Sequence, residues 1–303
     1  MQKPGKQVFF VFLAPAVLTY VIIFLYPTIR TTIMSFFAVE SVSDAVSKWS
    51  FNGITNYINL FGRALFIQSL KNIGRLWLFG GLGVMFLALF FAVILTGKLK
   101  GTNFYRRAIF LPYVVSAIAL GTMWINYVYN SDYGLLHTVL LKLSFTRLSQ
   151  TLWTSPGSLF WSMLAAYCFG MVGYHMLIFI SGIEQIPKDY FEAAYIEGAN
   201  GLQRFLNITI PGILGVIRTN IVMWTVFTVG FFIWAQMFSP LNLSTDTVAP
   251  MNFMYEQVFG SQSQASTVRD SGAGAGVGVI LMLIVIIVFT ATSFITKKGD
   301  MEI

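Results

Sequence analysis

The stretch 158-SLFWSMLAAYCFGMVGYHMLIFISG-182 carries no Asp, Glu, Lys or Arg. A helix that crosses the hydrocarbon core of a bilayer needs about 20 predominantly apolar residues, and this stretch is long enough. Its apolar character is continuous, whereas a strand of a membrane barrel would alternate polar and apolar residues over about 10 positions. The stretch therefore predicts a membrane-spanning helix.

Five further segments are long and apolar enough to span a membrane, at residues 8–30, 72–96, 108–129, 208–236 and 273–296. The first is longer than the apolar region of a signal peptide, about 7–15 residues, so we expect it to be retained as a span. The composition agrees, because 10% of the residues are charged and a soluble domain has about 25%. We therefore predict an all-α integral membrane protein with six transmembrane helices, in which residues 1–303 form a single transmembrane domain.

Glycine spacing predicts where one of these helices packs closely. In 271-SGAGAGVG-278 the glycines form overlapping pairs four residues apart, which let helix backbones approach each other in a membrane. The neighbouring helix belongs either to this chain or to another subunit.

Basic residues predict the orientation of the spans. An even number of spans places both termini on one side, and on that side the loops carry a higher density of Lys and Arg: Lys3, Lys6, Lys98, Lys100, Arg106, Arg107, Lys188, Arg204, Lys297 and Lys298. Because cytoplasmic loops are enriched in Lys and Arg, we expect both termini and residues 183–207 to be cytoplasmic. These small basic groups flank apolar runs, which favours anchoring in membrane lipid over binding to nucleic acid.

Several absences narrow the function. The sequence has no Gly-x-x-x-x-Gly-Lys-Ser/Thr phosphate loop, so we predict no ATPase site of that kind. A single cysteine, Cys168, and two widely separated histidines, His137 and His175, predict no metal site and no cofactor in this chain, and we expect it not to be an enzyme. All twelve acidic residues fall outside the predicted spans, which disfavours an ion-coupled secondary carrier or channel, although this alternative stays open.

A polar segment, 184-EQIPKDYFEAAYIEGANGLQRFLNITIPGI-213, separates the fourth and fifth spans. Pro187 and Asp189 suit the start of a helix. Gly198 and Gly201 predict a turn, and a second short helix over 202–209 should precede Pro211. The segment is therefore predicted to be a helix-turn-helix hook. From its residues alone, a docking hook and an amphipathic connector on the membrane surface are both open.

The pattern Glu192-Ala193-Ala194-x-x-Glu197-Gly198-Ala199, followed by Pro211, resembles the EAA motif of membrane subunits of binding-protein-dependent ABC importers. The stretches 26-YPTIRTTIMSFF-37 and 104-FYRRAIFLPYVVSAIALGTMW-124 are similar to carbohydrate-type (maltose-like) permeases, specifically the first of the two permease subunits. Gly215 stands where the motif usually has a second proline.

This resemblance implies a transmembrane subunit of an ATP-driven importer in a bacterial plasma (inner) membrane. It would form the translocation pathway for a sugar or oligosaccharide delivered by an extracellular or periplasmic solute-binding protein. The implied partners are a second homologous permease and two cytoplasmic ATPase subunits, which bind ATP and Mg²⁺. Residues 184–211 would be the coupling segment, with the contact residues Glu192, Ala193, Ala194, Glu197, Gly198, Ala199 and Pro211.

The resemblance also implies that spans flanking this segment contact the sugar. Aromatic faces that stack on sugar rings, with a hydroxyl partner, select Tyr167, Tyr174, Trp224, Thr228 and Phe231. The alternative is that these side chains pack within helix interfaces.

Overall fold

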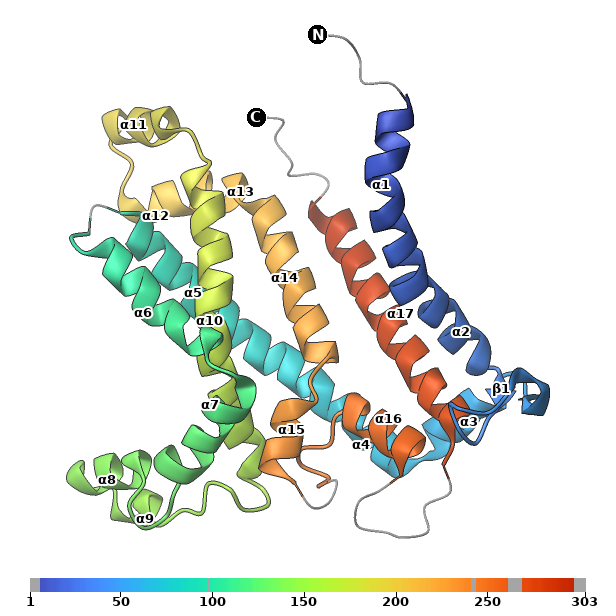
Figure 1. Cartoon of the computed structure of the whole chain (residues 1–303). Coiled ribbons are helices and arrows are strands. Elements are labelled where there is room, and N and C mark those ends of the chain that lie inside the picture. Colours follow the sequence, from blue (N-terminus) through green and yellow to red (C-terminus); the bar gives the residue numbers. More distant parts are fainter. Residues whose placement is uncertain (1–5, 98, 241–243, 261–268, 297–303) are drawn as a thin grey trace. The chain divides into compact units, whose positions relative to one another are not determined.

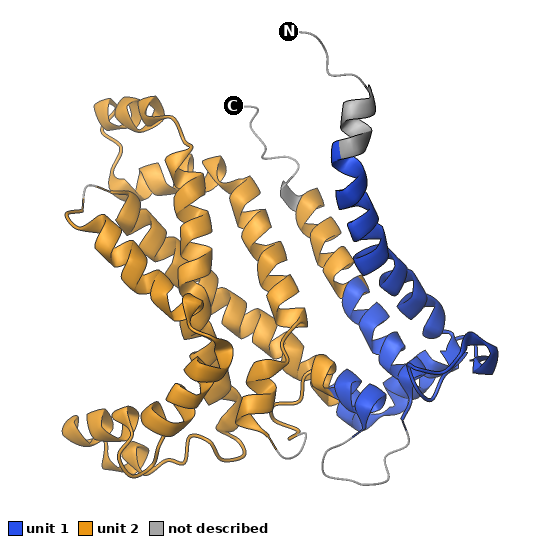
Figure 2. Cartoon of the chain, in the orientation of Figure 1, with its two compact units in different colours: residues 1–67, 253–282 blue, residues 68–252, 283–303 orange. Residues whose placement is uncertain are grey.

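The computed structural model describes residues 6–97, 99–240, 244–260 and 269–296, with the side chains of 12–294 within those ranges. The chain divides into two compact units (Figure 2). Unit 1 comprises residues 1–67 and 253–282, and unit 2 comprises residues 68–252 and 283–303.

Unit 1 contains the first apolar helix and a small loop region with two short strands (Figure 1). Its elements are α1 Lys6–Tyr20, the π-helical turn η1 Val21–Leu25, α2 Tyr26–Met34, β1 Phe37–Ala38, the 3₁₀ turn η2 Val46–Lys48, β2 Ser50–Phe51 and α3 Thr55–Gly62. The two strands pair antiparallel, with Phe37 opposite Phe51. Helix α17, Ser271–Thr296, begins in this unit.

The glycine-rich start of α17 packs inside unit 1. A Cβ on Gly272 would collide with the Phe37 carbonyl oxygen, and a Cβ on Gly274 would lie 2.5 Å from the Val258 side chain. Gly276 similarly faces Leu60. The close-packing face predicted from the glycine spacing is therefore covered by other parts of this chain.

Unit 2 holds most of the remaining helices (Figure 1). They are α5 Gly81–Thr96, α6 Thr102–Val114, α7 Ala117–Met123, α8 Leu135–Lys142, α9 Thr146–Ser149, α10 Leu159–Glu184, α11 Lys188–Ile196, α12 Gly201–Arg204, α13 Ile210–Gly212, α14 Leu214–Val229 and α15 Ile233–Phe238. The π-helical turns are η3 Leu76–Gly80, η4 Trp124–Val128 and η5 Phe205–Thr209. Helices α4 Ala64–Arg75 and α16 Pro250–Phe259 each cross the boundary between the units.

Helix α10 is the centre of unit 2, where it packs against α5, α6 and α14. Glycines make these approaches close. A Cβ on Gly173 would collide with the backbone of α6 at Ile109 and Phe110, and one on Gly81 would lie 2.7 Å from the Trp224 indole nitrogen. Trp224, 1% exposed, fills the space between these helices together with Met163 and Tyr167.

Four helices in the described part of the chain are long and apolar enough to cross a membrane: Phe12–Met34, Ala64–Thr96, Leu159–Glu184 and Ser271–Phe294. The number rises to six if two bent pairs each count as one span. These pairs are Thr102–Val114 with Ala117–Val128, bent by 96°, and Gly201–Gly212 with Leu214–Val229, bent by 68°. The protein is thus a mostly helical membrane protein with four to six candidate spans, and each bend follows a proline, Pro112 or Pro211.

Several span boundaries differ from the prediction, including those of the second and fifth spans. The second apolar helix starts at Ala64 rather than at residue 72, because amphipathic α4 continues without a break through η3 into α5. The predicted fifth span, 208–236, leaves the helix at Gly230 and resumes as the short α15 at Ile233.

Candidate functional site: the hook and the adjoining groove

The first limb of the hook, residues 184–211, is α11. It begins at Lys188 with Pro187 as the N-cap residue, and Asp189 lies in its first turn. A proline with φ −56° suits this position, since it lacks the N–H that the first turn leaves unpaired, and a carboxylate there is favoured by the helix dipole. The helix predicted to start at Pro187 is confirmed.

The turn of the hook depends on Gly198, which has φ +77°. Its N–H donates to the Tyr195 carbonyl at 3.1 Å, and the Ala199 N–H donates to the Ala194 carbonyl at 2.9 Å. These two bonds form a Schellman motif, which ends a helix on a left-handed residue that is usually glycine. The turn predicted around residues 198–201 is therefore a helix C-terminus followed directly by a new helix start.

The second limb starts at a capping box that the sequence analysis missed. The Asn200 side chain accepts from the Gln203 N–H at 2.9 Å, while the Asn200 N–H donates to the Gln203 side chain at 2.8 Å. The spacing of a short polar residue and Gln three positions later was the available signal. From there α12, η5 and α13 run to Gly212, with Pro211 at the start of α13.

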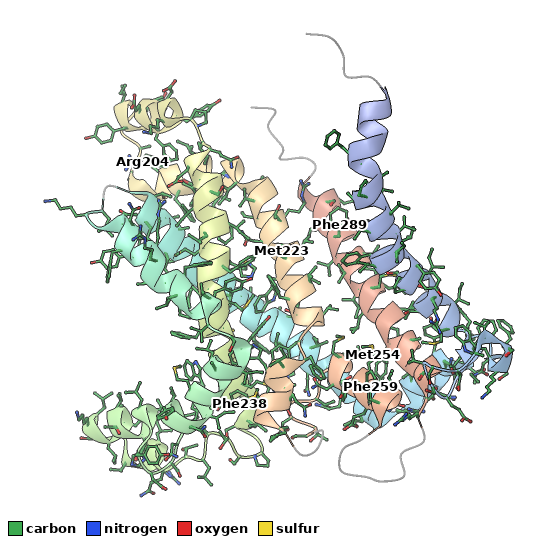
Figure 3. All side chains as sticks on the ribbon, in the orientation of Figure 1. Arg204, Met223, Phe238, Met254, Phe259 and Phe289 are labelled. Atoms are coloured by element: carbon green, nitrogen blue, oxygen red, sulfur yellow. The ribbon has the colours of Figure 1, made fainter. Side chains whose placement is uncertain are left out.

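The inner side of the hook rests on an apolar cluster. Ile186 and Ile213 are buried, and Phe191 and Ile208 pack against the same cluster, which includes residues of α5 and α10. A Cβ on Gly212 would lie 2.8 Å from Ile186, so the two ends of the hook meet closely. Arg204, labelled in Figure 3, lies on the second limb and contacts the first limb, with its guanidinium 5.8 Å from the centre of the Tyr195 ring.

The outer side of the hook carries most of the predicted coupling residues. Glu192, Ala193, Glu197 and Gly198 are exposed, while Ala194, Ala199 and Pro211 are half-buried. Two apolar neighbours also point outward, Tyr195 at 72% and Ile196 at 85% exposure. The sequence analysis missed them, although two large apolar residues between Ala194 and Glu197 in an otherwise polar segment were a visible signal. An exposed apolar pair beside carboxylates is typical of a surface that binds another protein.

An ion pair ties the base of the hook to the helices. Arg106 of α6 lies 2.6 Å from Glu184 at the end of α10 and also donates to the Leu95 carbonyl of α5 at 3.1 Å. One side chain therefore joins the ends of three helices next to the hook. In the described residues, no group of three or more His, Cys, Asp and Glu is placed to hold a metal ion.

The five predicted sugar-contact residues separate into two groups. Tyr167, Trp224, Thr228 and Phe231 are buried in the core of unit 2. Tyr167 lies edge-on to Phe231 with ring centres 4.9 Å apart, and the Trp224 indole N–H donates to the Trp77 carbonyl at 2.9 Å. In this conformation these four side chains pack against protein, and their contact with sugar stays a prediction.

Tyr174, the fifth, lines a groove of about 420 Å³ between α6, α10 and α14. Its ring packs on Tyr113 at 4.8 Å and against Phe227 at 5.1 Å. The neighbouring His175 is fully buried, and its Nδ1 lies 2.7 Å from the Asn220 side-chain oxygen of α14. His175 is therefore a buried hydrogen-bonding residue that links α10 to α14.

Comparisons with known proteins define the class. The family model described as "Binding-protein-dependent transport system inner membrane component" matches residues 85–298. The chain is 29% identical over 202 residues to the diacetylchitobiose uptake system permease protein NgcF of Streptomyces coelicolor, which covers 63% of this chain and 57% of that protein. It is 29% identical over 254 residues to the arabinooligosaccharides transport system permease protein AraP of Bacillus subtilis, which covers 82% and 77%.

Among solved structures, the fold is similar to a chain of a bacterial alginate ABC transporter crystallised in complex with an alginate pentasaccharide-bound periplasmic protein. The TM-score is 0.77 at 15% sequence identity, covering 97% of this chain and 95% of that chain.

The family match, together with the candidate spans, places the chain in the permease class of transport proteins. This chain belongs to the family of binding-protein-dependent transport system inner membrane components. It is a membrane permease component, as the resemblance in its sequence predicted.

Proposed function

We propose that this chain is one of two permease subunits of an ATP-driven importer and forms part of the pathway for a sugar or oligosaccharide. The relatives support the substrate class, since the similar permeases from S. coelicolor and B. subtilis serve a diacetylchitobiose and an arabinooligosaccharide system. A solute-binding protein delivers the sugar, a role that the alginate transporter complex supports by analogy of fold.

The observation that carries the proposal is the outer side of the hook. Residues 184–211 lie between α10 and α14, and they present Glu192, Glu197, Tyr195 and Ile196 to the outside of the unit. We assign this surface to a cytoplasmic ATPase subunit, which binds ATP and Mg²⁺ outside this chain. Ala193 and Ala194 allow the partner to approach closely, Gly198 and Ala199 form the turn, and Pro211 begins the return to α14.

The proposed topology has six spans, each bent pair counting as one, with both termini and the hook in the cytoplasm. The hook's inner side transmits motion because it packs on the ends of α5 and α10 and is continuous with α13 and α14. ATP-driven closure of the two ATPases would then tilt the helices that line the pathway, so residues 1–303 would work as one transmembrane subunit.

The test is reconstitution of the complete complex. The two permeases, two ATPase subunits and the sugar-loaded solute-binding protein should assemble, and the loaded binding protein should stimulate ATP hydrolysis. Glu192→Ala should weaken the binding of the ATPase subunits to the permeases, whereas Glu40→Ala, which removes an exposed carboxylate outside the hook, should leave that binding unchanged. Equal effects of the two substitutions would contradict the assignment of the hook.

A further inference from the structure

One face of α10 carries a row of uncharged polar side chains next to the hook. Tyr174, Ser181 and Gln185 are seven and four residues apart, so at 3.6 residues per turn they lie on the same face of the helix. All three line the groove of about 420 Å³ described above. Gln185 is the C-cap residue of α10, so the groove reaches the end of the helix from which the hook departs.

The opposite wall of the groove belongs to α14. Thr219 is exposed there, and its hydroxyl donates to the Gly215 carbonyl at 3.0 Å, which leaves its oxygen free to accept a hydrogen bond. Gly182 brings the two walls together, since a Cβ at that position would lie 2.5 Å from the Val216 side chain. The groove therefore lies between closely packed helices. Apolar side chains complete its lining, namely Phe110, Leu177, Ile178 and Val216. We name it the polar groove after its four polar residues.

Two of the polar side chains in the groove have no hydrogen-bond partner within the described part of the chain. Ser181 and Gln185 are exposed, and neither side chain bonds to another described residue. A polar group that faces hydrocarbon without a partner costs several kcal/mol in a membrane, so a row of them disfavours contact with lipid chains. The residues lining the groove include no Asp, Glu, Lys or Arg, so the groove suits an uncharged solute better than an ion.

We propose that the polar groove is this chain's share of the exit route by which the sugar leaves toward the hook side. The proposal rests on the proposed function and adds the residues that the leaving sugar touches. Ser181 and Gln185 can each donate and accept a hydrogen bond, as sugar hydroxyls do, and the Thr219 oxygen can accept one.

Cysteine labelling tests the route. In the reconstituted importer with Cys168 replaced by Ala, single Ser181→Cys, Gln185→Cys and Thr219→Cys variants are exposed to a charged maleimide added on the ATPase side without nucleotide. Phe169→Cys on α10 is the matched control, because Phe169 is 46% exposed but does not line the groove. Groove thiols should react about 10-fold faster than the control, because a thiol in water ionises and one in lipid does not. Sugar added at high concentration on the ATPase side should slow this labelling.

A further variant tests whether sugar passes through the groove, in addition to water reaching it. Ser181→Trp should reduce sugar import at least about 10-fold in a complex that still assembles with both ATPase subunits, because a bulky side chain narrows the route. Labelling no faster than Phe169→Cys, or import by Ser181→Trp at the wild-type rate, would overturn the proposal. If the wild-type complex imports no sugar at all, the proposed function itself is wrong, which is a different result.

Discussion

Substitution of Gly198 gives the sharpest test of the hook's geometry. At φ +77° an L-residue meets a steric penalty of about 1–2 kcal/mol. No atom lies within 4 Å of a Cβ built on Gly198, so within this chain the penalty comes from the backbone alone. A loss of 1–2 kcal/mol corresponds to a factor of about 5–30 in the ratio of hooks with the native turn to hooks without it.

Three substitutions at Gly198 should rank by backbone preference. Asn tolerates the left-handed region better than Ala, so Gly198→Asn should retain more function than Gly198→Ala although its side chain is larger. Gly198→Pro should be the most damaging, because proline fixes φ near −65° and removes the N–H that donates to the Tyr195 carbonyl. The predicted order of activity is Gly, Asn, Ala, Pro.

The assay is ATP-driven sugar uptake by the reconstituted importer, with proteolysis of the hook as a measure of its folding. A steric clash with the ATPase surface would instead rank the variants by side-chain size, with Ala above Asn. That order, or wild-type uptake by Gly198→Ala, would refute the reasoning from φ.

Three further sets of substitutions test the hook and the helices next to it. Asn200→Ala should lower the stability of the second limb by about 1 kcal/mol, seen as faster proteolysis there, since it removes the capping box; cleavage at the wild-type rate would contradict this. Arg106→Ala should lower the thermal stability of the complex more than Arg107→Ala, because Arg106 pairs with Glu184 and Arg107 is exposed; equal shifts would count against the brace. His175→Leu and Asn220→Leu should each cost about 1–3 kcal/mol by leaving a buried partner unpaired, and the double variant should cost less than the sum; additive losses in a thermal denaturation series would show that the pair does not interact.

Sequence patterns predicted the membrane class and the two limbs and turn of the hook, but not the capping box at Asn200. Apolar runs with few charges predicted the membrane-spanning helices, and Pro187 and Gly198 marked where α11 begins and ends. These features are local, because helix starts and left-handed turns depend on residues within a few positions of each other.

Features that depend on tertiary packing could not be predicted in the same way. Tyr167 and Trp224 were selected for their ability to stack on a sugar, yet the fold uses their rings to fill the space around α10. Their chemistry suits both roles, and only the packing of α5 and α14 on α10 decides between them. The bend after Pro112 was foreseeable as a position, but its angle of 96° depends on the neighbouring helices.

The row formed by Tyr174, Ser181 and Gln185 lies between these cases. The spacing of these three residues is visible in the sequence. The sequence does not show which face of the long apolar helix α10 is left uncovered, because most of its residues are buried by neighbouring helices. The row lines a groove only because α14, with Thr219, forms the opposite wall, and the sequence does not give the position of α14.

The central claim is that this permease moves its sugar only when a partner ATPase acts on the hook. The most direct measurement is radiolabelled sugar uptake into proteoliposomes that contain either the complete complex or this chain alone, with ATP or with an imposed ion gradient. We expect uptake only by the complete complex, with ATP and the loaded binding protein. A complex that carries Glu192→Ala should lose most of this uptake. Sugar accumulation by the chain alone under an ion gradient would contradict the central claim.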